Sequence, residues 1–329
     1  MPIPKKLFAV LDLPVLTSLL QDAGVKIVDV GGRGSAFHPL LTLAPFAHYF
    51  VSEPDVEEAE RLRKQLPDEA EWRDVTVITE AIASRRGVAN LHVTIQPGMS
   101  SLLEPDVEVT RRFHLAQKFR VVSIVEVPTL PLDEAAAQYG FADAAFLKLD
   151  TQGTELDILE SGPRLLGESL LGVHTESCFH AFYKGQAVFA EIDSHLRHRG
   201  MVLFSLSRTT LRRSGFRKSL YSKRIIAWAH CLYFREPETL LAASGDALRR
   251  QLSRLLAMAL AFQHFDLAFE IVGLAHRVQL VPDIDLTRLR EEVERAAGLS
   301  TRYMLHKAEG VRFADSIMAR SFRDKNHLE

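Results

Sequence analysis

The chain has 329 residues, of which 47% are hydrophobic and 25% are charged, and its formal net charge at pH 7 is −2. This composition predicts a globular protein with a sizeable core, and it excludes a surface built throughout for nucleic acid or anionic membrane. The two cysteines, Cys178 and Cys231, lie far apart, so neither a disulfide framework nor a cysteine zinc site is indicated and a reducing cytoplasm is expected.

Two apolar stretches resemble targeting or membrane segments but fail as such. Residues 7–20 follow Lys5 and Lys6, yet Asp12 and Pro14 interrupt them and no small-residue cleavage site follows. Residues 252–269 contain several charged and polar side chains, which a membrane span does not tolerate. We therefore expect a soluble, cytoplasmic protein.

From residue 25 onward, short apolar runs alternate with amphipathic stretches, as in a largely parallel sheet covered by helices. Before residue 80 the pattern predicts strands over 25–30, 48–52 and 75–79, and helices over 35–47 and 54–65. Between residues 88 and 127 the apolar period becomes two, which predicts an antiparallel insertion with a flexible middle at 97–101.

The alternation of helix and strand resumes after the insertion. Strands are predicted over 144–150, 170–175, 201–206 and 225–234, and helices over 132–139, 154–166 and 189–199. Gly140 is the expected C-cap of the helix over 132–139.

Beyond Pro237 the composition shifts to leucine, alanine and charge without strand signals. One helical face is predicted from Leu248, Leu252, Leu255, Leu256, Ala259 and Phe262, and a second from Leu286, Leu289, Val293 and Ala296 between Asp285 and Gly298. We expect a sheet domain over 1–235 and a helical appendage over 236–329, packed on that domain or on a second copy of the chain.

A glycine turn follows the first strand. Gly31, Gly32 and Gly34 stand where the chain must turn sharply and let a ligand approach its backbone, although a plain loop has the same appearance. The third glycine of the dinucleotide pattern is missing. Asp29, just before the turn, would repel a pyrophosphate and attract an ammonium group.

Acidic and small residues follow the next two strands. Glu53 comes about 20 residues after the glycine turn, where a carboxylate accepts both ribose hydroxyls of an adenosine ligand. Taken alone, Glu53 is equally typical of the start of a helix. Glu80 and Ala81 follow the third strand, in a segment whose small and apolar side chains suit an adenine ring.

These segments resemble the FkbM-like methyltransferases, a branch of the class I S-adenosylmethionine-dependent enzymes. The resemblance covers about residues 25–234. It rests on DVGGRGS at 29–35, SEP at 52–54, EAIAS at 80–84, TLPLDE at 129–134, FLKLDTQGTELDIL at 146–159 and HTE at 174–176. The chain departs from the family at Arg33, where the family usually has Asn.

The resemblance implies a Rossmann-like, doubly wound, seven-stranded sheet that is mostly parallel with an antiparallel last strand. It further implies S-adenosylmethionine as the cofactor and O-methylation as the reaction. Asp29, Gly31, Glu53 and Ala81 are the positions that match the family's cofactor site.

Methyl transfer from a sulfonium is an in-line displacement, so the protein must align the acceptor oxygen with the methyl carbon. A hydroxyl acceptor also benefits from a base. Asp150, at the end of the fourth strand, is the first candidate for that base or for positioning the acceptor. Lys148 lies on the same strand face and would keep this carboxylate ionised, unless the two form only a structural ion pair.

Further candidates surround Asp150. Glu155 is either a substrate contact or a residue that complements the helix dipole. Glu176 ends the adjacent strand, and with Asp150 it forms a catalytic pair or, less favoured, a divalent-cation site; no metal is expected. His174 and His180 flank Glu176, and each is a candidate base or an ordinary hydrogen-bonding residue; His180 is also a candidate substrate contact.

A basic stretch without acidic residues joins the last two strands at the same sheet edge. It contains Arg208, Arg212, Arg213, Arg217, Lys218, Lys223 and Arg224. Arg212 and Arg213 are candidates for binding a phosphate on the acceptor, and the alternative is a solvated loop. Aromatic residues are sparse there, so nucleic acid is not the expected partner.

The sequence thus predicts an S-adenosylmethionine-dependent O-methyltransferase. Its expected acceptor is a sugar or another polyhydroxylated molecule that can carry a phosphate. A non-catalytic nucleoside-binding module that recruits a partner is the alternative, and the missing third glycine disfavours a nicotinamide-dependent oxidoreductase. The helical appendage is a candidate surface for forming a homo-oligomer.

Overall fold

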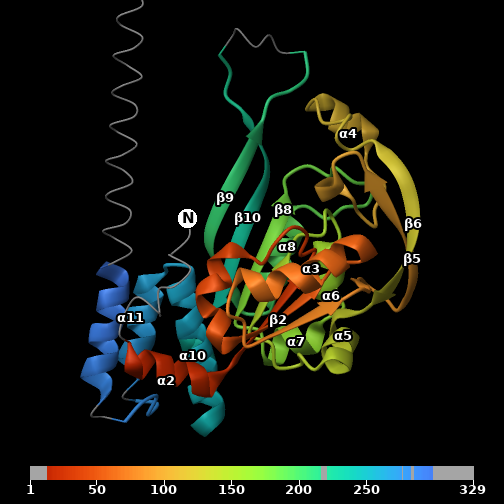
Figure 1. Ribbon diagram of the computed structural model, residues 1–329. Helices are drawn as coiled ribbons and strands as arrows, with labels where there is room; N and C mark the ends of the chain where they lie inside the picture. The colour runs from red at the N-terminus through yellow and green to blue at the C-terminus, as the bar shows by residue number, and fades with distance from the viewer. Residues whose placement is uncertain (1–12, 216–220, 276, 283–284, 299–329) are drawn as a thin grey trace, which may run out of the picture.

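A twisted seven-stranded sheet forms the centre of the computed structural model, which describes residues 13–215, 221–275, 277–282 and 285–298 (Figure 1). The strand order is β3-β2-β1-β7-β8-β10-β9. The parallel strands are β1 (Val25–Val30), β2 (Ala47–Ser52), β3 (Asp74–Ile78), β7 (Phe146–Leu149) and β8 (Gly172–Cys178).

The far edge of the sheet contains its antiparallel strand. β10 (Ile225–Arg235) runs antiparallel to both β8 and β9 (Met201–Leu211). The predicted mostly parallel sheet with an antiparallel last strand is confirmed. Because β1 is followed along the chain by β2 on one side and pairs with β7 on the other, the strand order reverses between β1 and β7, and ligands of open sheets bind at such a point.

Helices cover both faces of the sheet because its strands are apolar on both sides. One core lies under α2 (Pro14–Ala23), η1 (His38–Phe46), α3 (Val56–Glu69), α10 (Gly245–Ala261) and α11 (Phe265–Leu274). The other lies under α5 (Leu132–Tyr139), α6 (Glu155–Glu160), α7 (Pro163–Glu168) and α8 (Phe189–His198). Gly140 ends α5 with a left-handed backbone, as predicted. The single helix expected over 154–166 is wrong, because Gly162 and Pro163 divide it into α6 and α7.

A second, three-stranded sheet lies beside the first, in the order β4-β6-β5. β5 (Gly87–Thr94) and β6 (Val121–Leu130) are antiparallel, as the sequence predicts, and β4 (Ala81–Ile82) joins β6 in parallel. The segment expected to be flexible is instead folded: η2 (Pro97–Met99) leads to Ser101, whose backbone pairs with His92. The short α4 (Val107–Arg112) follows.

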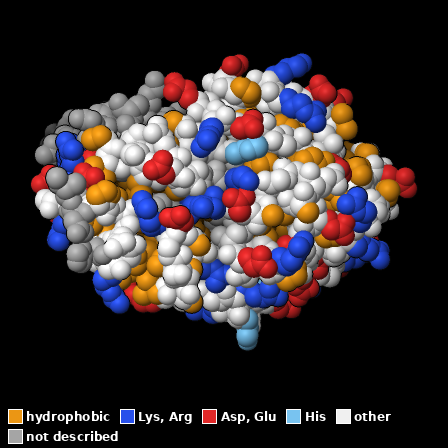
Figure 2. All heavy atoms as spheres, turned by 90° about the horizontal axis from the view of Figure 1, so that it is seen from below, with side chains coloured by type: hydrophobic (Ala, Val, Ile, Leu, Met, Phe, Trp, Pro, Cys, Tyr) orange, Lys and Arg blue, Asp and Glu red, His pale blue; other side chains and the backbone are white. Residues whose placement is uncertain are grey.

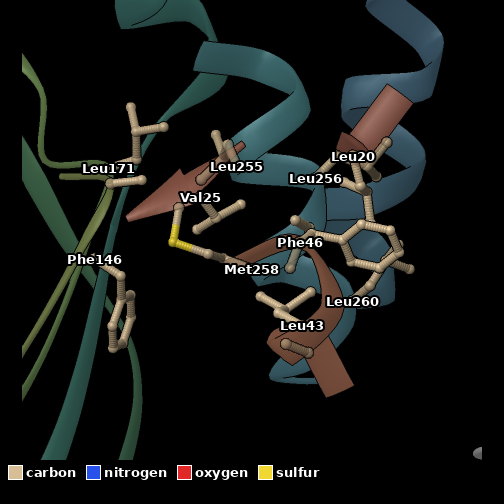
Figure 3. Close-up of a cluster of buried hydrophobic side chains, with 14 of the residues drawn as sticks. Leu20, Val25, Leu43, Phe46, Phe146, Leu171, Leu255, Leu256, Met258 and Leu260 are labelled. Carbon is tan, nitrogen blue, oxygen red and sulfur yellow. The ribbon is translucent and has the colours of Figure 1, made fainter. Parts of the chain in front are cut away.

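The C-terminal helices pack on the sheet. After the short α9 (Pro237–Leu240), α10 buries the predicted face, and side chains of α10, α2, η1 and the sheet point toward one another in Figure 3. A further helix over 285–298 buries Leu289, Val293 and Ala296 in the same core. The division of the chain at residue 235 and the assembly of two copies remain predictions.

Charges of both signs are interspersed on the face shown in Figure 2, with hydrophobic side chains scattered between them. This mixture agrees with the near-neutral net charge, because no field of one sign covers that face. Within the described residues, no helix combines the length and the apolar character needed to cross a membrane.

Side chains from the C-terminal helices bind both ends of α2. The buried Glu292 carboxylate accepts the N–H groups of Val15 at 3.2 Å and Leu16 at 2.8 Å. At the other end, the Arg254 guanidinium donates to the carbonyls of Ala23 at 3.2 Å and Gly24 at 2.7 Å. A negative charge at a helix N-terminus and a positive charge at its C-terminus both interact favourably with the helix dipole. The stability of α2 therefore depends on the C-terminal helices.

Replacing Glu292 by Gln should lower the free energy of unfolding by about 1–3 kcal/mol, because one of the two buried N–H groups loses its acceptor. Urea denaturation followed by circular dichroism measures this change. The neighbouring Glu291 is exposed, so Glu291→Gln is the matched control and should have little effect. Equal effects of the two substitutions would contradict the role assigned to Glu292.

Candidate active site

A pocket opens at the carboxyl ends of β1, β2 and β7, beside the point where the strand order reverses. Its lining from the main sheet is Val30, Gly31, Arg33, Glu53, Pro54, Lys148, Asp150, Thr151, Gln152 and Thr154. The second sheet and its turn contribute Ala81, Ile82, Leu91, Pro97, Gly98, Ser100, Ser101 and Leu102. The glycine turn, Glu53 and Asp150 therefore share one pocket. Part of its second wall comes from the 97–101 segment, which the sequence predicted only to be flexible.

The glycine turn brings β1 close to its neighbours. Gly31 has φ +76°, and a Cβ there would overlap the carbonyl oxygen of Asp150, so only glycine fits. A Cβ at Gly32 would overlap the side chain of Val51. Gly32 and Gly34 do not line the pocket, and the Gly34 N–H donates to Glu58 at 2.8 Å. Of the three predicted cofactor glycines, Gly31 is the one at the pocket surface.

A buried ion pair joins β1 to β7 beneath this turn. The Lys148 ammonium lies 2.8 Å from Asp29 Oδ1 and donates to the Gly31 carbonyl at 2.9 Å. The Tyr49 hydroxyl donates to the other Asp29 oxygen. Burial by itself would lower the pKa of Lys148, but the carboxylates of Asp29 and Asp150 raise it, so the ammonium stays charged.

This pairing differs from the expectation that Lys148 serves Asp150 and that Asp29 attracts a ligand ammonium. Asp29 and Lys148 stand directly opposite each other in the parallel register, on one face of the sheet, so their side chains meet. Asp29 is 1% exposed and does not line the pocket. Its charge is already balanced by Lys148.

Glu53 presents a carboxylate to the pocket from the end of β2. It is 5% exposed, and its Oε1 accepts the Asp55 N–H at 3.0 Å. No hydrogen bond from the described residues reaches Oε2. Burial raises the pKa of Glu53, while the Asp55 N–H and the Arg33 guanidinium, 4.0 Å away, oppose that shift. A buried carboxylate with a free oxygen suits the hydroxyl donors of a ribose.

The second sheet supplies the apolar side of the pocket. Ala81, Ile82 and Leu91 line it and offer a surface suited to a flat ring. Glu80 lies outside the lining, because its carboxylate accepts the Tyr139 hydroxyl at 2.7 Å. Of the two residues predicted here, only Ala81 reaches the pocket.

One amide side chain, which was not predicted from the sequence, bridges two carboxylates at the ends of β7 and β8. Gln152 Nε2 lies 2.8 Å from Asp150 Oδ1 and 3.1 Å from Glu176 Oε1. Burial, followed by the charges of Asp150 and Glu155, raises the pKa of Glu176 to about 8. Asp150 and Gln152 line the pocket, whereas Glu176 lies behind them. The feature of the sequence that could have pointed to Gln152 is its position within the 146–159 motif.

Glu155 shapes the turn after β7. It is 2% exposed, and its carboxylate accepts the N–H groups of Thr151 at 2.9 Å and Gly153 at 3.0 Å. Burial raises the pKa of Glu155, and these backbone bonds oppose the shift. Glu155 is absent from the pocket lining, so the structure places it as a support for the turn and not against a substrate.

The histidines near Glu176 differ in environment. The His174 ring contacts the rings of Phe37 and His230, with distances between ring centroids of 4.4 Å and 5.6 Å. Burial lowers the pKa of His174 to about 3. Such a histidine is a poor proton acceptor at neutral pH. His230 Nε2 lies 3.8 Å from Glu176 Oε2 and comes from β10.

His180 packs against Phe113 at 5.1 Å, outside the pocket lining. Burial lowers its pKa, and the positive charges of Arg213 and Arg112 add to the shift. Arg212 and Arg213 follow the last residue of β9, and Arg217 and Lys218 lie outside the described residues. Among the described residues, no three His, Cys, Asp or Glu side chains are grouped to hold a metal ion.

Comparison with known proteins finds one family model that matches part of the chain. Residues 51–203 match the family model described as the methyltransferase FkbM domain. Over this segment, which is just under half of its length, the chain is similar to the FkbM methyltransferases. It is an S-adenosylmethionine-dependent enzyme, and the match covers Glu53, Ala81, the 148–155 segment and Glu176 but not the glycine turn.

Individual proteins are similar to this chain over part of its length. The 2-O-methyltransferase NoeI of Sinorhizobium fredii is 27% identical over 175 residues, which cover 52% of this chain and 70% of NoeI. A magnesium protoporphyrin IX methyltransferase from Synechocystis PCC 6803, solved with bound SAM, has a TM-score of 0.33 and 11% identity, with 68% and 76% of the chains covered. An Agrobacterium tumefaciens methyltransferase has a TM-score of 0.33 and 9% identity, with 70% and 62% covered.

The pocket fits S-adenosylmethionine, which supplies a methyl group activated on a sulfonium. Gly31 allows close approach to the backbone, Glu53 offers a free carboxylate oxygen, and Ala81 with Ile82 offers an apolar surface. Individual contacts of these residues with the cofactor remain predictions.

Substituting Glu53 by Ala should weaken binding of S-adenosylhomocysteine by about 2–4 kcal/mol, or about 30- to 1,000-fold, through the loss of charge-assisted ribose bonds. Because burial raises the pKa of Glu53, affinity of the wild type should fall as pH drops through that raised value. Titration calorimetry across the acid range measures both effects. Glu57→Ala, at an exposed position of α3, is the control, and unchanged affinity of Glu53→Ala would remove Glu53 from the site.

Lys148→Met should destabilise the fold by about 3–5 kcal/mol, because the buried Asp29 would lose its counter-charge. Lys26→Met removes a more exposed ion pair, with Asp143, and should cost less than about 1 kcal/mol. Urea unfolding of both variants gives the comparison. A small effect of Lys148→Met would contradict a central role for the buried pair.

Proposed function

We propose that this chain is an FkbM methyltransferase, which transfers the methyl group of S-adenosylmethionine to a hydroxyl oxygen of a sugar or another polyhydroxylated, phosphate-bearing acceptor. The observation that carries the proposal is Asp150, whose carboxylate borders the cofactor pocket. One of its oxygens is held by Gln152, and among the described residues no hydrogen bond occupies the other. That oxygen can accept a hydroxyl proton as the bond to carbon forms.

The likeness to a 2-O-methyltransferase supports an oxygen acceptor. The Asp150 oxygen that Gln152 leaves free also supports an acceptor with several hydroxyl groups, since one carboxylate oxygen can accept hydrogen bonds from two neighbouring hydroxyls. The protein must then hold the reacting oxygen in line with the methyl carbon, which fixed side chains on strand ends achieve better than mobile ones.

Two arginines support a phosphate on the acceptor. The Ser214 N–H donates to the Arg112 carbonyl at 2.6 Å, so the end of β9 contacts α4 and brings Arg213 near Arg112. Both side chains are exposed, both lower the pKa of His180, and neither forms an ion pair with a described residue. Guanidinium groups without a carboxylate partner are suited to a phosphate.

The reaction is tested by incubating the protein with S-adenosylmethionine and three acceptor panels: nucleotide-linked sugars, sugar phosphates and free sugars. We expect release of S-adenosylhomocysteine with the phosphate-bearing panels, and an O-methyl group in the product by NMR. Binding of S-adenosylhomocysteine without turnover on any panel would contradict the proposal and favour a non-catalytic module.

Replacing Arg112 and Arg213 together by Ala should raise KM for a phosphate-bearing acceptor by about tenfold or more and leave kcat within about twofold, because the arginines contact a part of the acceptor that does not react. Arg250→Ala, at an exposed position of α10, should change neither value. An equal loss with free sugars would show that the two arginines do not bind the phosphate.

A further inference from the structure

The turn after β7 holds Gln152 in an unusual backbone conformation. Its φ is +59°, in the left-handed region that non-glycine residues seldom occupy, and Gly153 follows with φ +114°. Glu155 accepts the N–H groups on both sides of Gln152, at Thr151 and Gly153. The backbone is thus held in place by a buried carboxylate.

The side chain of Gln152 is fixed at both ends of its amide. The one proton of the Tyr183 hydroxyl has two acceptors within reach and is shared between the Met99 carbonyl at 2.9 Å and Gln152 Oε1 at 3.2 Å. Nε2 then faces the carboxylates of Asp150 and Glu176, at 2.8 Å and 3.1 Å. An amide NH₂ has two donors, so each carboxylate receives one N–H and their mutual repulsion is reduced.

We propose that Gln152 is the positioning residue of the acceptor side, which holds Asp150 and Glu176 together so that the free oxygen of Asp150 faces the acceptor hydroxyl. This proposal rests on the proposed transfer to a hydroxyl. In that transfer the acceptor O–H proton moves to Asp150, the new O–C bond forms, and the C–S bond breaks with its electron pair remaining on sulfur.

The charges around the pair agree with this role. Lys148 faces the Asp150–Glu176 pair from β7, Glu155 faces it from the first residue of α6, and His230 faces it from β10. Burial and the charges of Asp150 and Glu155 raise the pKa of Glu176 to about 8, so Glu176 is largely protonated at neutral pH and repels Asp150 less. Loss of the bridging N–H groups would disfavour ionisation, so the apparent pKa values of the pair would rise.

Three substitutions distinguish the effect of the bridging amide from the effects of the surrounding residues. Gln152→Glu keeps the shape and the acceptor for Tyr183 but replaces the bridging donor by a third carboxylate. Gln152→Asn keeps an amide and tolerates the left-handed backbone, yet it is too short to reach both partners. Gln138 also donates to a carboxylate, that of Glu80 at 3.4 Å, but at an exposed position outside the pocket, so Gln138→Glu is the matched control.

The decisive measurement is an NMR titration of protein labelled with ¹³C at the Asp and Glu carboxyl carbons, without any acceptor. We expect Gln152→Glu to raise the apparent pKa values of the Asp150–Glu176 pair by about one unit or more, Gln152→Asn to raise them less, and Gln138→Glu to leave them unchanged. In turnover assays, Gln152→Glu should lower kcat by about tenfold or more and move the acid limb of the pH profile upward.

A titration of Gln152→Glu identical to that of the wild type would overturn the proposal. Binding of Mn²⁺ that Asp150→Asn abolishes would overturn it too, because a cation between the carboxylates would require the amide oxygen to face them. The titration needs no acceptor, so its result is independent of whether a hydroxyl acceptor is found.

Discussion

The buried ion pair between Lys148 and Asp29 is the interaction on which the site depends. It links the strand that leads into the glycine turn with the strand that ends at Asp150, and Lys148 also binds the Gly31 carbonyl. A lone charge in either position would be costly at this depth, so each residue requires the other. The cofactor side and the reacting side of the pocket are therefore built as one unit.

Steric fit strengthens the same link. The space that a side chain at position 31 would need is filled by the carbonyl of Asp150, so the glycine turn and the end of β7 cannot shift independently. The turn after β7 is in turn held by Glu155, whose carboxylate binds the backbone on both sides of Gln152. Alignment of an acceptor oxygen with a methyl carbon demands such rigidity, because catalysis falls steeply with small displacements.

Much of this architecture can be predicted from the sequence because it follows from local patterns. The apolar runs of β1 and β7 specify buried parallel strands, the glycines specify a sharp turn, and an acidic residue after β2 specifies a carboxylate at the same sheet edge. Gly31, Glu53, Ala81 and Asp150 accordingly meet at one pocket. The predicted faces of α10 and of the helix over 285–298 are also buried, since helical periodicity depends only on neighbouring turns.

Side-chain pairings that depend on strand register and on tertiary contacts cannot be predicted from local sequence patterns. Lys148 and Asp150 are two residues apart in sequence, but Lys148 pairs with Asp29 because the register places those two directly opposite. Glu80 and Glu155 stand at positions typical of ligand contacts, yet Tyr139 and the 151–153 backbone take up their carboxylates. Gln152 gains its role only from Asp150, Glu176 and Tyr183, which lie on different elements. The acceptor side of the pocket thus depends on contacts between segments that are distant in sequence. A single sequence carries the least information about such contacts, and therefore about the chemistry of this side of the pocket.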